Sequence, residues 1–135
     1  MRYFGVEEAN RLIPLLTHTF SVVRPRVERV HAIVRELEAL QGTGTEPERM
    51  TSLREERDVL IEQIHTELEH FQELGVEVKA ADGLVDFRAL KAGRPVLLCW
   101  RYGEPEVAHW HELEGGFAGR QPIVHAHDFA PSYLS

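Results

Sequence analysis

The chain has 135 residues, of which 43% are hydrophobic and 27% are charged, and its formal net charge at pH 7 is −7. One domain with its own core is expected at this length, while the acidity disfavours a nucleic-acid surface and no apolar run reaches the roughly 20 residues that span a bilayer. Because Cys99 is the one cysteine and residues 1–5 carry no basic-then-apolar leader pattern, we expect a cytoplasmic protein without internal disulfides and without a membrane partner.

The first half of the chain, residues 5–75, is predicted to form a helical hairpin. Apolar residues of its first helix recur at spacings of four and three over four heptads, which places them on a single stripe. Gly5 is a suitable N-cap, because the acids Glu7 and Glu8 then fall in the first turn and complement the helix dipole. The stripe consists of Ala9, Ile13, Leu16, Phe20, Val23, Val27, Val30, Val34 and Leu37.

Two prolines, Pro14 and Pro25, fall inside this first helix. Each removes a backbone donor and crowds the carbonyl group four residues earlier, yet the apolar stripe continues in register through both. We therefore expect one continuous helix with a kink at one of the two prolines. A local basic patch on the same helix leaves a nucleic-acid contact open despite the overall acidity; it consists of Arg24, Arg26, Arg29 and Arg35.

Glycines at positions 42 and 44 are expected to end the first helix, and Thr45 is expected to cap a second helix that runs to Leu74. Pro47 suits the first turn of this second helix. Its apolar stripe consists of Met50, Leu53, Leu60, Ile64, Leu68, Phe71 and Leu74.

The length of the hairpin has a consequence for assembly. A first helix of this size is about 50 Å long, at about 1.5 Å per residue. The 60 residues that follow position 75 cannot cover two helices of that length. We therefore expect a homodimer in which the helices of two copies pack together.

After residue 75 the apolar period changes from helical to alternating, which predicts a small antiparallel sheet over residues 76–121. Strands are expected at 76–79, 84–87, 96–102 and 106–113, with turns at 82–83 and 103–105. The expected fold is therefore a single α+β domain, in which a long antiparallel, coiled-coil-like two-helix hairpin is followed by a small antiparallel β-sheet. Residues 122–135 show no period and are expected to form an extended C-terminal arm.

The turn at 103–105 decides which side chains meet on the last two strands. If this turn has three residues, Cys99 lies opposite His109, and His111 lies on the same face about 5–7 Å away. These three side chains can share a divalent metal such as zinc, with Asp86 or Glu112 as an additional carboxylate ligand. A turn one residue longer would separate them. A half-exposed strand and a buried, inert cysteine form the competing and more common interpretation.

A glycine-rich segment, residues 115–120, follows the last strand and ends in Arg120. Glycines allow successive backbone N–H groups to point into one concavity, and an adjacent arginine can bind a small anion through two hydrogen bonds. The lysine and the serine or threonine of a P-loop are absent. The competing and more common interpretation is a glycine turn whose arginine pairs with Glu112 or Glu114.

Three stretches carry a family resemblance: EEANRLIPLL at 7–16, GLVDF at 83–87 and LCWRYGEPEVAHWHELEGGFAGRQPI at 98–123. Together they resemble the bacterial domain of unknown function 2203 family, which implies this architecture and a bacterial source but no activity. His109 departs from the family pattern, in which an aromatic residue is expected before the Trp–His pair. The motif positions implied by the resemblance are Asp86, Trp100, Arg101, Trp110, His111, Glu112, Phe117, Gly119 and Arg120.

Two functions remain open from these patterns. The first is a homodimer that binds a divalent metal or a small anionic ligand near residues 110–112 and the turn at 119–120. The alternative is a non-enzymatic scaffold or protein-interaction module that uses the helical stripe and has no small-molecule site. On a regular strand, His111 and Glu112 point to opposite faces, so one site uses both only if the strand ends or bulges there. The candidate metal ligands are Asp86, Cys99, His109 and His111, and the candidate anion-binding residues are Arg101, His111, Glu112 and Arg120.

Overall fold

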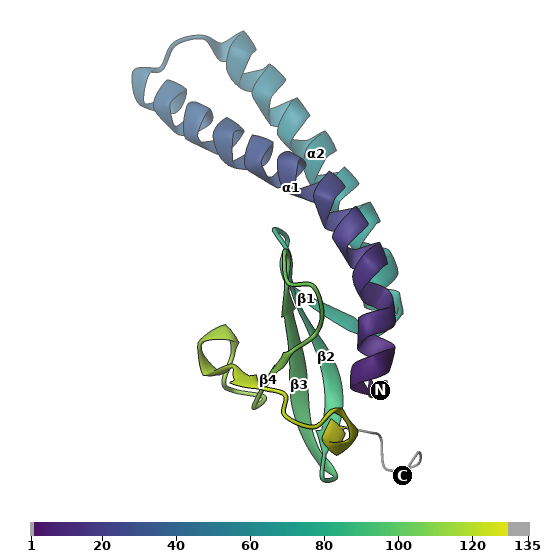
Figure 1. Ribbon diagram of the computed structural model, residues 1–135. Helices are drawn as coiled ribbons and strands as arrows, with labels where there is room; N and C mark the ends of the chain where they lie inside the picture. The colour runs from purple at the N-terminus through teal and green to yellow at the C-terminus, as the bar shows by residue number, and fades with distance from the viewer. Residues whose placement is uncertain (1, 130–135) are drawn as a thin grey trace.

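The computed structural model describes residues 2–129 and confirms the predicted α+β fold, in which a long helical hairpin is followed by an antiparallel sheet (Figure 1). The helices are α1 (Val6–Thr43) and α2 (Pro47–Glu73). The strands, in their order across the sheet, are β1 (Val76–Ala80), β2 (Leu84–Lys91), β3 (Arg94–Arg101), β4 (His109–His111) and β5 (Gln121–Pro122). Two 3-10 helices are η1 (Phe117–Gly119) and η2 (Ala126–Phe129). Among the described residues, neither long helix has an apolar stretch sufficient to cross a bilayer.

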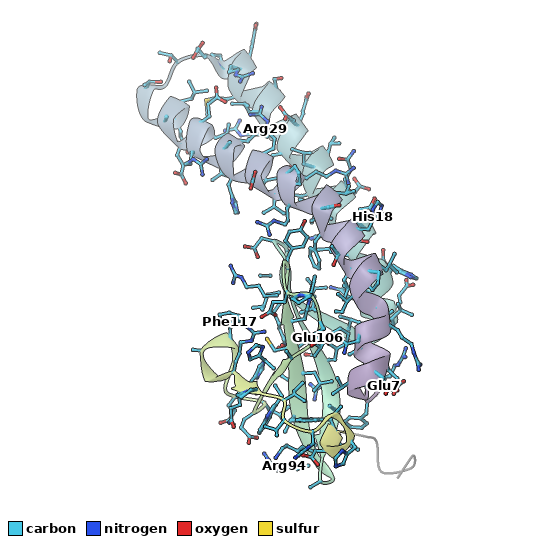
Figure 2. All side chains as sticks on the ribbon, in the orientation of Figure 1. Glu7, His18, Arg29, Arg94, Glu106 and Phe117 are labelled. Carbon is cyan, nitrogen blue, oxygen red and sulfur yellow. The ribbon has the colours of Figure 1, made fainter. Side chains whose placement is uncertain are left out.

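Helix α1 begins after Gly5, whose backbone N–H donates to Glu8 Oε1 at 3.1 Å. The helix runs unbroken through both prolines. The hairpin nevertheless bends near its middle (Figure 1), between the labelled His18 and Arg29 in Figure 2, which is the interval that contains Pro25. The part before the bend packs on the sheet, and the part after it leaves the sheet. The bend therefore separates the helical layer over the sheet from a projecting arm.

The predicted stripe of α1 is correct before the bend and slips after it. Val34 is 37% exposed, and Ile33 is fully buried in its place. Before the bend, α1 packs in one core with both α2 and the sheet, whereas after the bend its buried residues Ile33 and Leu37 form a small separate cluster with Leu53 of α2. Because the packing partner changes at the bend, a different side of α1 is buried after it.

The N-terminus of α2 also differs from the prediction. Its N-cap is Glu46, with a left-handed φ of 55°, and the hydroxyl of Thr45 instead lies 2.8 Å from that of Thr43. Ion pairs across the hairpin then occupy part of the basic patch of α1. Arg29 Nε donates to Glu56 Oε2 at 2.6 Å, and the other cross-hairpin pairs are Arg26–Glu67 and Arg49–Glu36.

The predicted register of the last hairpin is confirmed, because Cys99 pairs with His109 and Leu97 pairs with His111. The return strand, however, is only three residues long instead of the predicted 106–113. Ahead of β4, the backbone N–H of Val107 donates to the Asn10 side chain at 2.7 Å instead of to a neighbouring strand. This contact with α1 draws residues 104–108 away from the ladder.

Alternation along the strands gives the sheet two different faces. The face toward the helices contributes only apolar side chains to the main core: Val76, Val85, Phe87, Ala89, Val96, Leu98, Trp100 and Trp110. The opposite face carries Asp86, Leu97, Cys99 and His111, which are also buried. The segment that follows β4, including η1, lies on this second side of the sheet, away from the helices (Figure 1).

Residues 122–129 differ from the predicted extended arm. Ile123 N–H donates to the Ala108 carbonyl at 2.9 Å, and the chain then forms η2. Phe129 is 1% exposed, and its ring centroid lies 5.8 Å from that of Trp110. Phe129 therefore anchors this otherwise mostly exposed stretch to the core. Residues 130–135 of the predicted arm lie outside the described residues.

Candidate metal centre

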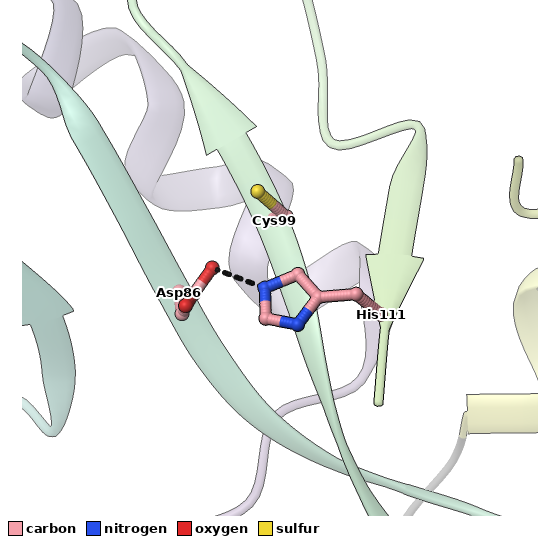
Figure 3. A group of neighbouring side chains, drawn as sticks. All are labelled: Asp86, Cys99 and His111. Atoms are coloured by element: carbon pink, nitrogen blue, oxygen red, sulfur yellow. Dashed lines mark hydrogen bonds and ion pairs between the residues drawn. The ribbon is translucent and has the colours of Figure 1, made fainter. Parts of the chain in front are cut away.

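Three adjacent strands bring Asp86, Cys99 and His111 together on the face of the sheet away from the helices (Figure 3). Asp86 of β2 pairs directly with Cys99 of β3, and His111 of β4 lies diagonally next to Cys99. The three residues are between 1% and 3% exposed. One carboxylate oxygen, the thiol sulfur and one imidazole nitrogen all lie within 4.8 Å of one another. We call these three residues the metal group.

The hydrogen bonds of His111 fix which of its ring nitrogens carries a proton. Nδ1 lies 2.7 Å from the backbone carbonyl oxygen of Glu112, and a carbonyl oxygen can only accept, so Nδ1 is the donor. Nε2 then faces Asp86 Oδ1 at 3.1 Å. Two acceptors cannot share this short contact. Either one further proton lies between Nε2 and Oδ1, or the Nε2 lone pair binds a cation.

Cys99 is not an activated nucleophile. Burial raises the pKa of its thiol to about 12; the Asp86 carboxylate adds to the rise, and Arg120 acts in the opposite direction. Reactive cysteines have a lowered pKa. A bound metal, in contrast, displaces the proton of a coordinating thiol outright, so this environment fits a ligand better than a nucleophile.

The structure leaves two of the predicted residues outside the metal group. His109 pairs with Cys99 along the backbone, but its Nδ1 lies 3.8 Å from Glu104 Oε2, and its side chain is 36% exposed. The Glu112 carboxylate points away and forms an ion pair with Arg94, while only its backbone carbonyl reaches His111. The metal group therefore lies on the face of the sheet that carries His111, and the Glu112 side chain does not take part in it.

Arg120 and Arg101 lie beside the metal group and share one aromatic ring. The guanidinium of Arg120 lies 4.6 Å from the Phe117 ring centroid, and that of Arg101 lies 5.4 Å from it. Arg120 Nη2 donates to Glu104 Oε1 at 2.6 Å and to the Cys99 carbonyl at 3.3 Å. Glu104 therefore takes the place of Glu112 and Glu114, the acids expected to pair with Arg120.

Glu104 is a residue that the sequence did not single out, because a glutamate between glycine and proline reads as an exposed turn. Here it accepts hydrogen bonds from Arg120 and from the backbone N–H of Arg101, the latter at 2.7 Å. Partial burial alone would raise the pKa of Glu104, but these hydrogen bonds outweigh it and lower the pKa. Glu104 is therefore an ionised, fixed partner of Arg120.

Comparison with known proteins identifies the family and nothing narrower. No curated protein and no solved structure matched the chain. The sequence profile of the family described as "Uncharacterized conserved protein (DUF2203)" matches residues 2–123. This range includes both helices, all five strands and the metal group. The chain therefore belongs to the DUF2203 family.

Proposed function

We propose that this protein binds one divalent transition metal through Asp86, Cys99 and His111. The observation that carries the proposal is the hydrogen bond from His111 Nδ1 to the Glu112 carbonyl, which aims the Nε2 lone pair at the carboxylate and the thiol. Histidines that bind metals commonly donate their other ring N–H to a carbonyl or carboxylate in this way. The mixed nitrogen, sulfur and oxygen donors suit zinc.

The separations of the three donor atoms are compatible with one ion. Zinc bonds of about 2.0–2.3 Å place tetrahedral ligands about 3.3–3.8 Å apart, and the donor atoms here lie within 4.8 Å of one another. Small side-chain rotations are sufficient to close that difference. A doubly charged ion would be neutralised by the Asp86 carboxylate and the Cys99 thiolate, which removes the cost of a net buried charge.

Metal analysis of protein purified without a histidine tag tests this proposal. We expect one ion per chain, and cobalt(II) titration should produce thiolate-to-cobalt absorption in the near ultraviolet. Cys99→Ala and His111→Ala should abolish both signals, whereas the matched controls His109→Ala and Glu112→Gln should retain them. Absence of stoichiometric metal and of cobalt binding in the unmodified protein would refute the proposal.

A second candidate function is assembly through the helical arm, which we propose as the contact of a homodimer. The arm beyond the bend has only Ile33, Leu37 and Leu53 in its buried cluster. Its surface also exposes the apolar side chains Val34 and Val59, 37% and 56% respectively. A cytoplasmic location fits both proposals, because a reducing compartment keeps the Cys99 thiol free. Light scattering coupled to size exclusion should give twice the chain mass, and the monomer mass would contradict assembly.

A further inference from the structure

A second polar cluster, formed by Glu104, His109 and Arg120, borders the sulfur side of the metal group. Arg120 Nη2 donates to the backbone carbonyl of Cys99 and to the Glu104 carboxylate. The positive charge of this guanidinium also acts on the Cys99 thiol and opposes the rise in the pKa of that thiol. His109 lies opposite Cys99 in the ladder and turns its ring toward Glu104. The two clusters are therefore neighbours on one face of the sheet.

Two nitrogen atoms of this second cluster have no partner. Arg120 Nε and His109 Nδ1 are buried and form no hydrogen bond in the described residues. Glu104 does not satisfy His109, because its nearer oxygen is 3.8 Å away. Native proteins rarely leave a buried guanidinium N–H unpaired, and such an atom points to a water molecule, an ion or a ligand. The side chains that carry these two nitrogens both lie beside the Glu104 carboxylate, which places them in one neighbourhood.

The metal group also lacks a fourth ligand. Within residues 2–129, the cluster of metal-ligating side chains has three members. Zinc sites with three protein ligands complete their coordination with water or with a substrate oxygen. Resting on the proposed metal binding, we propose that a small carboxylate fills this position and that Arg120 and His109 hold it.

Charge favours a monoanion over a dianion at this position. The ion is balanced by Asp86 and Cys99, and Arg120 is balanced by Glu104. Arg101, an exposed residue that stacks on Phe117 and forms no ion pair within residues 2–129, adds one positive charge at the edge of the site. A carboxylate balances this one positive charge, whereas a phosphate dianion would leave an excess negative charge near a buried site. The planar carboxylate also matches the edge of a guanidinium.

The segment over this face, residues 112–120, has several backbone hydrogen bonds to itself. Between residues 112 and 120, the backbone hydrogen bonds stay inside the segment, as in Gly115 N–H to Glu112 and Arg120 N–H to Phe117. Gly116 has a φ of 59°, a conformation that glycine adopts without steric cost. The stacking of Phe117 on two arginines joins the segment to the sheet.

Titration of the cobalt(II)-loaded protein with sodium acetate, at constant pH and ionic strength, tests the inference. We expect a saturable change in the visible cobalt bands, with acetate bound at least tenfold more tightly than inorganic phosphate. Arg120→Lys should weaken acetate binding at least tenfold and His109→Ala at least threefold, while cobalt affinity changes less than threefold. Arg94→Gln, which removes a surface arginine, should change nothing.

The outcomes separate the two proposals. If cobalt binds but acetate leaves its bands unchanged, the carboxylate inference is wrong and the metal proposal stands. If acetate binds equally well to Arg120→Lys and to the unmodified protein, Arg120 is not the anchor and the inference is wrong. Phosphate that binds as tightly as acetate would overturn the charge argument. Failure to bind cobalt at all would remove both proposals.

Discussion

Both faces of the sheet are buried, but they carry different kinds of side chain. Toward the helices, apolar side chains pack together, as in the contact of Phe20 with Trp100 at 6.2 Å between ring centroids. On the other face lie a carboxylate, an imidazole and a thiol. Apolar burial stabilises a fold without further conditions, whereas buried charges stabilise it only if they are paired and hydrogen-bonded. The polar face is therefore the one whose composition calls for a functional explanation.

The largest effect is expected on the apolar face, from Trp100→Ala. Trp100 is fully buried, and its indole N–H donates to the Glu104 carbonyl at 2.9 Å. The substitution leaves a cavity and should lower the free energy of unfolding by about 3–5 kcal/mol, as measured by urea denaturation. Val124→Ala, at a side chain that is 77% exposed, is the control and should stay within about 0.5 kcal/mol. A loss below about 1 kcal/mol for Trp100→Ala would place the core elsewhere.

The next largest effect on stability is expected on the polar face, from Asp86→Leu. Asp86→Leu removes the partner of His111 Nε2 at 3.1 Å and leaves a buried imidazole facing an apolar side chain. In metal-free protein it should cost about 3 kcal/mol. The double variant Asp86→Leu/His111→Phe removes both polar groups and should recover most of that loss, although it binds no metal. Urea denaturation in the presence of a chelator measures both. Equal losses in the single and double variants would show that the two residues are not coupled.

The sequence was sufficient to predict the features that depend on residues near one another in the chain. Local rules were sufficient for the register of the last hairpin, because Cys99 pairs with His109 as predicted, although residues 102–108 connect the strands in place of the expected three-residue turn. The helical stripe before the bend was also correct, since its spacing reports directly on burial. These features depend on residues that are near one another in the chain.

The rest of the site depends on contacts between distant parts of the chain. The shortening of β4 follows from the hydrogen bond between Val107 and Asn10, which are 97 positions apart. The exclusion of His109 follows from the position of Glu104, a turn residue whose role is visible only after folding. Alternation brought His109 and His111 to one face, but it could not decide which of them would point to Asp86.

A smaller effect, on metal affinity, tests whether the Cys99 thiol on the polar face is a metal ligand. Because the pKa of the Cys99 thiol is raised to about 12, the thiol is protonated across the physiological range and must lose its proton when a metal binds. Rising pH should therefore tighten binding by at least tenfold per unit, or about 1.4 kcal/mol. Cobalt titrations between pH 6.5 and 8 measure this slope. Cys99→Ser should lower the slope by one proton, and an unchanged slope would mean that the thiol is not a ligand.

The smallest expected effect tests whether residues 112–120, which cover the polar face, are part of the core or can move away from it. Phe117 is 41% exposed, and it stacks on Arg101 and Arg120 without entering the main apolar cluster. Phe117→Ala should therefore cost only about 0.5–1 kcal/mol, much less than a buried aromatic residue on the other face. Phe117→Leu, which keeps apolar volume without an aromatic ring, should lose nearly as much if cation–π contacts hold the segment.

Release of cobalt to a chelator should be severalfold faster in Phe117→Ala than in the unmodified protein, because the metal leaves through the segment that this ring holds down. Arg94→Gln is the matched control, since it alters a surface contact of Glu112 without touching Phe117. If Phe117→Ala lowers stability by as much as a core substitution, the cover is part of a second core. If residues 112–120 cover the metal group without being part of the core, Phe117→Ala should combine a small loss of stability with faster release of cobalt.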